Sequence, residues 1–221
     1  MRISPLAALM MIALAGCASL PMGGLRQDAA PTPAIQGPVP ATAENVTALQ
    51  EAVADSARSL VGRRRLSVEG RRYNFDCSGT ILAAYHQAGV DLYPEFQRHS
   101  GNGVRRLYAI AETYPVAGAA AIAPGDLIFW DNTYDRNNNG AWDDPLTHAG
   151  IVVSVDPDGT ISYVHHNYRR GIVVEQMNLA EPHNLENNSP MRMRGEPNSR
   201  GRWLSSHLFR SGGRPYMLLV E

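Results

Sequence analysis

The sequence carries almost no net charge, which limits the kinds of partner it can have. Its 20 basic residues are balanced by 21 acidic residues, for a formal net charge of -1. Such a chain has no overall field that would attract nucleic acid. We therefore expect no nucleic-acid partner and local recognition of any polymeric substrate. The length of 221 residues suits one domain with a leader and a tether, and we expect a monomer.

Cysteine is also scarce, because the chain contains only Cys17 and Cys77. Cys17 directly follows an apolar N-terminal run, whereas Cys77 lies in the polar segment Phe75-Asp76-Cys77-Ser78-Gly79. Contexts this different make a disulfide between them a poor explanation. Each cysteine therefore needs its own function.

The N-terminal apolar run, from Leu6 to Ala15, is too short to span a bilayer, and it has the length of a secretory signal. It is followed by Leu14-Ala15-Gly16-Cys17, which resembles the lipobox of bacterial lipoproteins. The resemblance implies a signal peptide over 1–17, lipidation of Cys17 and, with Ala18 rather than Asp next, a place on the periplasmic face of the outer membrane. The alternative is an ordinary cleaved signal in which Cys17 is incidental.

Large apolar residues are rare between Ala18 and Ala43, where five prolines are concentrated. Such a segment buries too little surface to offset the entropy of ordering. We predict a disordered tether over 18–43 and a folded domain over 44–221. The domain begins with an amphipathic helix, capped by Thr42 and ended by Gly62, whose apolar stripe is Val46, Leu49, Val53, Ala57 and Leu60.

Further along the chain, the pattern predicts one more core helix and then several strands. The helix should run from Ser78 to His86 or beyond, with Gly89 as its stop. Strands are expected at 127–130, 149–155, 161–165, 171–175 and 216–220, after a surface excursion over 184–213. The order of helices first and then an antiparallel meander predicts an α+β domain with helices packed on one face of the sheet.

An arginine-rich segment separates the two helices. Arginines at 63–65 and 71–72 flank a turn at Glu69-Gly70. Such a segment is either a solvated basic loop or a site for a substrate carboxylate.

Two residues carry the candidate chemistry. Cys77 lies where a loop turns into a helix, and free backbone N–H groups there favour the nucleophilic thiolate. His148 stands at the start of an apolar strand and is followed by Ala149 and Gly150, which allow another backbone to approach closely. An imidazole can take the thiol proton and return it to a leaving amine. Taken singly, Cys77 could equally be a buried structural cysteine, and a histidine in the position of His148 is more often structural.

The order of four motifs makes the pairing specific. These are Asp76-Cys77-Ser78-Gly79, Pro124-Gly125-Asp126-Leu127-Ile128-Phe129, His148-Ala149-Gly150-Ile151 and Tyr163-Val164-His165. Together they resemble the NlpC family of papain-like cell-wall cysteine peptidases. The resemblance implies a papain-like fold, Cys77 as nucleophile, His148 as base and His165 as the residue that orients the base. It further implies an acyl-enzyme, cleavage of amide bonds in peptidoglycan stem peptides and no required cofactor.

Two details depart from a simple match. His166 and Asn167 compete with His165 for the orienting role, although strand alternation and the aromatic-Val-His pattern favour His165. The family also carries a tyrosine about a dozen residues before its cysteine, where this chain has Arg64-Arg65-Leu66. The nearest tyrosine is Tyr73, so the contacts on the oxyanion side and the substrate preference differ from the family pattern.

A calcium-like loop precedes His148. In the segment 135–143, oxygen-bearing side chains occupy positions 1, 3, 5 and 9 and glycine occupies position 6, as in a calcium loop; the candidate ligands are Asp135, Asn137, Asn139 and Asp143. Position 12 is Leu146 instead of glutamate, so Asp131 or Asp144 would have to substitute. The sequence thus allows either a structural calcium site or a polar turn without an ion.

Three functions fit these observations. The first is a lipid-anchored peptidoglycan endopeptidase that uses Cys77, His148 and His165. The second is a CHAP-type amidase or acyltransferase that uses the same Cys-His pair on another bond. The third is a non-catalytic wall-binding lipoprotein, against which the joint presence of the three residues argues.

Overall fold

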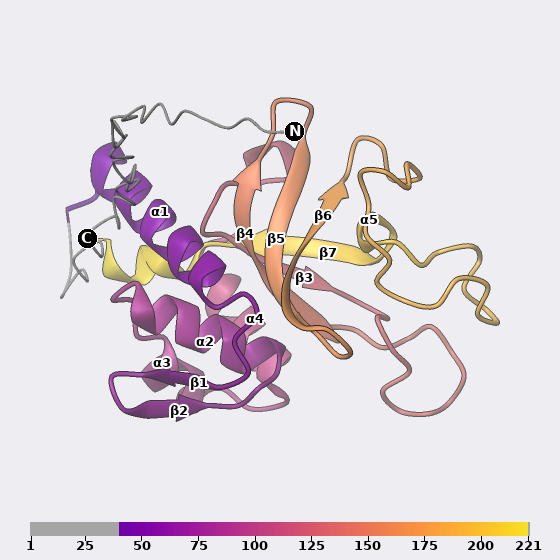
Figure 1. Ribbon diagram of the computed structural model, residues 1–221, viewed down its shortest axis with the longest axis horizontal. Helices are drawn as coiled ribbons and strands as arrows, with labels where there is room; N and C mark the ends of the chain where they lie inside the picture. Colours follow the sequence, from indigo (N-terminus) through magenta and orange to yellow (C-terminus); the bar gives the residue numbers. More distant parts are fainter. Residues whose placement is uncertain (1–39, 221) are drawn as a thin grey trace, which may run out of the picture. The chain divides into compact units, whose positions relative to one another are not determined.

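The computed structural model describes residues 40–220 (Figure 1). The predicted signal peptide, Cys17 and nearly all of the predicted tether lie outside the described residues. Within 40–220, no helix combines the length and the apolar character that a membrane span requires.

The described chain has an α+β fold. Its helices are α1 (Ala43–Ser59), α2 (Cys77–Gln87), α3 (Tyr93–Arg98), α4 (Gly103–Ala111) and α5 (Ser205–Leu208), with short 3-10 helices η1 (Ala119–Ala121) and η2 (Pro215–Leu219). Its strands are β1 (Leu66–Val68), β2 (Arg71–Tyr73), β3 (Leu127–Trp130), β4 (His148–Val155), β5 (Thr160–Asn167), β6 (Gly171–Asn178) and β7 (Phe209–Gly213).

Five strands form one antiparallel sheet in the order β6-β5-β4-β3-β7. Strand alternation divides its side chains between two cores. Ala149, Ile151 and Val153 belong to the core shared with the helices, whereas Val152 and Trp130 belong to a second core on the opposite face. Figure 1 shows α1 and α2 on the helical side of this sheet. The predicted α+β fold with an antiparallel sheet is confirmed, and α1 and α2 pack on one face as expected, whereas the short α5 lies at the second core through Leu208.

The two core helices form where the pattern predicts them. The Thr42 hydroxyl caps α1 by accepting the Asn45 N–H at 3.2 Å, and Leu49, Val53 and Ala57 are fully buried along the predicted stripe. The stop signals also act as expected, since Gly62 and Gly89 both adopt the left-handed conformation that glycine accepts without strain.

The predicted last strand at 216–220 is wrong. That segment forms η2, and Pro215, which has no N–H to donate to a ladder, begins it. The last strand is instead β7, which lies inside the predicted excursion and pairs with β3. A Cβ atom on Gly213 would lie 2.4 Å from the Ala111 carbonyl oxygen, so glycine lets β7 approach α4 closely.

Only the second part of the arginine-rich segment forms a hairpin, of β1 and β2, whereas Arg63, Arg64 and Arg65 precede it in an exposed loop. Glu69 and Gly70 both have positive φ, as a two-residue turn between paired strands requires. Arg71 is committed to a structural ion pair, because its guanidinium lies 2.7 Å from the Asp91 carboxylate.

Candidate active site

Cys77 is the first residue of α2. The backbone just before it, at Asn74, packs closely against the first turn of the helix. Gly79 N–H donates to the Asp76 carboxylate at 2.7 Å, and the Ser78 hydroxyl donates to the same oxygen at 2.8 Å, so Asp76 caps the helix. A Cβ atom on Gly79 would lie 2.0 Å from the Asn74 carbonyl oxygen. Only glycine fits there, and the fit holds the cysteine at the start of the helix.

Burial governs the charge state of Cys77. It raises the pKa of the thiol to about 12, with a contribution from the Asp76 charge. The backbone N–H groups of Ser78, Ala149 and Cys77 lower this pKa, as the helix position predicts, but they do not outweigh burial. The residue keeps some exposed surface, while its sulfur is surrounded by protein atoms. A thiolate at Cys77 therefore needs a neighbouring cation.

His148 is the first residue of β4, and the backbone of the residue after it reaches Cys77. The N–H of the following residue, Ala149, is among the groups that act on the Cys77 sulfur. His148 Nε2 lies 2.7 Å from His165 Nδ1, and the two rings are perpendicular at 89°. Burial, with His165 and His166 nearby, holds the pKa of His148 well below its usual value near 6.5. An imidazolium here therefore needs an anion beside it, which a Cys77 thiolate would supply.

The two strands that carry these histidines meet without a side chain between them. A Cβ atom on Gly150 would lie 3.1 Å from the Val164 carbonyl oxygen and 3.3 Å from His165 Cβ. Both separations are tighter than ordinary contact, so glycine lets β5 approach β4 at the histidine pair. This is the close approach that the small residues after His148 predict.

Of the three candidates for the orienting residue, His165 is the one in contact with His148. His165 is 2% exposed, and burial, with nearby Arg170, lowers its pKa to about 3. His166 points to the other face of β5, where its ring packs edge-on against Phe75 at a centroid separation of 4.5 Å. The Asn167 amide donates to the Glu175 carboxylate at 3.3 Å.

Glu175 on β6 is a residue that the sequence patterns do not single out. Its carboxylate is buried and lies 3.1 Å from His165 Nε2. Strand alternation could have pointed to it, because Glu175 is directly opposite Tyr163 and so shares a face with His165. Without the pairing of β5 with β6, however, a glutamate in a strand is no signal of a site.

The loop that leads to His148 is held at its base. The Leu146 N–H donates to the Asp131 carboxylate at 2.7 Å, and the backbones of Asn132 and Asp144 are joined by an N–H to carbonyl bond of 2.8 Å. The 184–213 segment contacts this loop, since the guanidinium groups of Arg192 and Arg202 pack on the Trp142 ring at 4.3 and 5.0 Å from its centroid. These contacts give the 184–213 segment a structural role beside the site.

The calcium-like loop is drawn together by its own side chains. The Asp135 carboxylate accepts the N–H groups of Asn139 and Gly140, and the amides of Asn137 and Asn139 lie within 3.4 Å of the Asp143 carboxylate. The proposed substitutes at position 12 already have partners: Asp131 accepts from Arg210 and from the Leu146 N–H, and Asp144 Oδ2 accepts the Arg136 N–H. The buried Oδ1 of Asp144 has no hydrogen-bond partner among the described residues.

No cluster of three or more His, Cys, Asp or Glu side chains suited to a metal ion is present in residues 40–220. The predicted calcium set contains only two such side chains, so calcium binding stays a prediction.

Tyr73 does not take the place of the missing family tyrosine at the nucleophile. Its hydroxyl lies 2.9 Å from His86 Nδ1 and accepts from Arg71 at 3.2 Å, so the side chain joins β2 to the far end of α2. Arg64 and Arg65, which stand at the family position, are exposed.

The fold and the site define the class of protein. The sheet is antiparallel and flanked by helices, a cysteine begins helix α2, and a histidine begins strand β4. This arrangement is papain-like. A family model agrees: the chain matches the NlpC/P60 family over residues 62–184, more than half of its length, and it belongs to that family. No curated protein and no solved structure matches the chain. Membership supports a cell-wall peptidase type of function and a substrate related to peptidoglycan.

Proposed function

We propose that this chain is a cysteine endopeptidase that cleaves amide bonds in the peptidoglycan stem peptide. His148 takes the proton of the Cys77 thiol as the sulfur attacks the substrate carbonyl, and it gives that proton to the leaving amine. The resulting thioester is hydrolysed by a water that His148 activates in turn. Backbone N–H groups at the start of α2 are available to stabilise the oxyanion.

The arrangement of His148 carries this proposal. Its Nε2 is engaged by His165 at 2.7 Å, while the adjacent Ala149 N–H acts on the Cys77 sulfur. Burial opposes a lone thiolate and a lone imidazolium alike, so the proton moves productively only between these two partners.

Purified sacculi and defined stem peptides provide the test. The intact protein should release peptide fragments, and Cys77→Ala and His148→Ala should each abolish the release. Mass spectrometry of the fragments identifies the bond: cleavage between D-glutamate and the diamino acid supports the proposal, whereas cleavage at the sugar-peptide amide would identify an amidase. Binding to sacculi without any release would indicate a wall-binding protein.

We also propose, from the lipobox resemblance, that Cys17 is lipidated and holds the protein at the periplasmic face of the outer membrane. Membrane fractionation tests this idea. Cys17→Ser should move the protein from the membrane fraction to the soluble periplasmic fraction, and continued sedimentation of the variant with membranes would contradict it.

A further inference from the structure

Behind the histidine pair lies a buried carboxylate that the proposed reaction does not itself use. The side chain of Glu175 is 3% exposed, and its Oε2 lies 3.1 Å from His165 Nε2. Its Oε1 receives the Arg170 guanidinium and the Asn167 amide, and the Tyr163 hydroxyl lies 3.4 Å from Oε2. Oε1 therefore has two strong donors, whereas Oε2 is the oxygen that faces the histidine.

The contact to His165 is short, but it is not a linear hydrogen bond. The ring nitrogen has no partner that satisfies hydrogen-bond angles, although the two atoms are only 3.1 Å apart. At this separation the charge of the carboxylate acts on the ring nitrogen, and an ionised carboxylate can only accept a proton. A proton on His165 Nε2 is attracted to it, whereas a bare nitrogen lone pair is repelled.

The position of that proton decides what His148 can do. A hydrogen bond between His148 Nε2 and His165 Nδ1 needs one proton between the two nitrogens. With the His165 proton on Nε2, His165 Nδ1 must accept, so His148 carries its proton on Nε2 and keeps Nδ1 free as a base. In the opposite tautomer His148 Nε2 accepts, its proton sits on Nδ1, and that nitrogen cannot take a proton from Cys77.

We propose that Glu175 is a positioning residue that selects the tautomer of His165 and thereby leaves His148 Nδ1 unprotonated and able to act as the base. This inference rests on the proposed function of Cys77 and His148, and it extends the Cys77–His148–His165 set by one residue. A neutral His165 is consistent with it, because burial and Arg170 both disfavour the charged ring.

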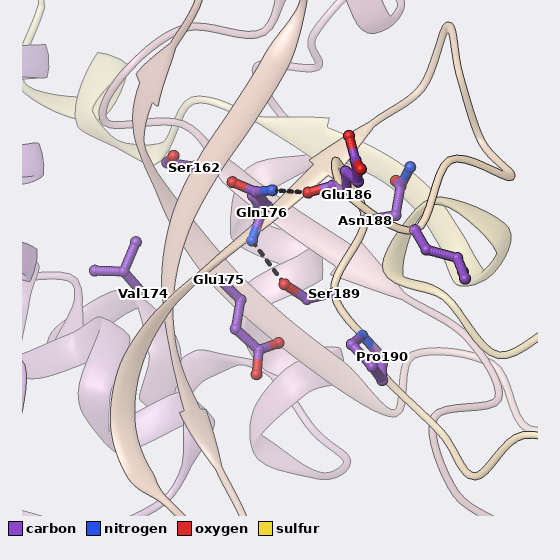
Figure 2. Close-up of a pocket in the computed structure, with 9 residues that line it drawn as sticks. Ser162, Val174, Glu175, Gln176, Glu186, Asn188, Ser189 and Pro190 are labelled. Atoms are coloured by element: carbon purple, nitrogen blue, oxygen red, sulfur yellow. Dashed lines mark hydrogen bonds between the residues drawn. The ribbon is translucent and has the colours of Figure 1, made fainter.

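The excursion helps to keep Glu175 in place. Ser189 makes two hydrogen bonds to Gln176, the residue after Glu175. The Ser189 N–H donates to the Gln176 carbonyl at 2.8 Å, and the Ser189 hydroxyl accepts the Gln176 N–H at 3.1 Å. A cavity of about 270 Å³ lies between β6 and this segment, and Glu175 and Glu186 are among the residues that line it. Figure 2 shows these lining residues. Glu186 shares the cavity, but its backbone carbonyl, and not its carboxylate, is bonded there.

Glu175→Gln tests the role of the carboxylate directly, because the surrounding hydrogen-bond donors fix the orientation of the glutamine amide. Arg170 and Asn167 both donate toward Oε1, so the amide oxygen would take that place and the amide nitrogen would face His165. An NH2 group donates to His165 Nε2, which forces the His165 proton onto Nδ1. The variant should therefore reverse the tautomers of both histidines without changing the shape of the side chain.

The test is nitrogen-15 NMR on histidine-labelled protein at pH 8, in a Cys77→Ala background, so that the readout does not depend on activity. We expect His165 to be protonated on Nε2 and His148 to be unprotonated on Nδ1. Glu175→Gln should shift both rings toward the opposite tautomer. Glu186→Gln is the matched control in the same cavity and should change neither ring. Arg170→Gln removes the ion pair but keeps the carboxylate, so it should lower the melting temperature without reversing the tautomers.

Kinetics on stem peptides, with Cys77 intact, give a second readout. In the serine-protease triad, losing the carboxylate that sets the histidine tautomer lowers kcat about 10⁴-fold. Glu175 acts through one more ring, so we expect Glu175→Gln to lower kcat by at least about tenfold with little change in KM, and Glu186→Gln to match the wild type.

Two NMR results would overturn the inference: a wild-type His165 protonated on Nδ1, or a Glu175→Gln variant that keeps the wild-type tautomers. The first needs no variant and holds even if Glu175→Gln fails to fold. If the wild-type protein cleaves no wall peptide, the proposed function fails, and the tautomer spectra still decide the role of Glu175.

Discussion

Asp126 offers a test of how the site scaffold is held together. This carboxylate, in the Pro124-Gly125-Asp126 turn before β3, is fully buried. It accepts the Tyr216 hydroxyl at 2.7 Å and the Ala123 N–H at 2.9 Å, and the Arg214 Nε lies 3.4 Å away. The carboxylate thus ties η2 at the C-terminal end to the strand beside His148.

Its ionisation should cost stability. Burial raises the pKa of Asp126 from 3.8 to about 6, despite the opposing effects of Tyr216, Ala123 and Arg214. The folded protein therefore binds the proton more tightly than the unfolded chain does, and stability must fall as the pH rises through the window between these two values. A shift of roughly two units corresponds to about 3 kcal/mol at 1.36 kcal/mol per unit.

The assay is urea denaturation of the wild type and of Asp126→Asn, followed by circular dichroism between pH 3.5 and pH 8. Other groups titrate equally in both proteins, so they cancel in the difference between the two free energies of unfolding. At pH 3.5 the variant should be the less stable by about 1 kcal/mol, because its amide nitrogen cannot accept the Ala123 N–H. From there to pH 8 the difference should move in favour of the variant by about 3 kcal/mol.

A difference that is independent of pH, or that moves against the variant as the pH rises, would refute this reasoning. Tyr216→Phe supplies a second check. The Tyr216 hydroxyl lowers the pKa of Asp126, so its removal should move the inflection of the stability curve to higher pH. An inflection at the wild-type position would show that the hydroxyl does not act on this carboxylate.

Three further predictions concern the site itself. His148→Ala should slow alkylation of Cys77 by iodoacetamide at pH 7 by about a hundredfold or more, because a thiol whose pKa is about 12 then lacks its base. The control variant His166→Ala should be alkylated at close to the wild-type rate. Equal slowing in both variants would contradict the assignment of His148 as the base. Gly150→Ala should lower the free energy of unfolding by about 1–3 kcal/mol and reduce peptide hydrolysis, because the added methyl group pushes β5 away from β4. Denaturation and peptide release measure the two effects. A variant as stable and as active as the wild type would count against the close approach of the strands. Added calcium should raise the melting temperature of the wild type but not of Asp135→Ala, and a transition that calcium leaves unchanged would remove the metal from this loop.

The sequence alone was enough for the local parts of this protein. The stripe from Val46 to Leu60 predicted α1 because the 3.6-residue period and the Thr42 cap act within one helix. The same holds for the start of α2 at Cys77 and for the meander that begins at β3. The pairing of Cys77 with His148 stays a prediction, and it rests on four ordered motifs that describe a family pattern.

Local signals failed where a distant segment decided the structure. The apolar residues at 216–220 predict a strand, but Tyr216 is buried in the core, where its hydroxyl donates to Asp126. The true last strand, β7, carries Gly212 and Gly213, which are weak strand formers. They are favoured there only because the backbone of β3 and the end of α4 leave no room for a Cβ atom.

The candidate site shows the same contrast between what local sequence indicates and what distant contacts decide. The roles proposed for Cys77 and His148 rest on residue type and on the order of the motifs, because cysteine and histidine are able to act as nucleophile and base. The partner of His148 and the protonation of Cys77 depend on burial and on strand register, which are properties of the folded chain. Glu175 contributes no pattern of its own, and only the pairing of β5 with β6 places its carboxylate behind His165.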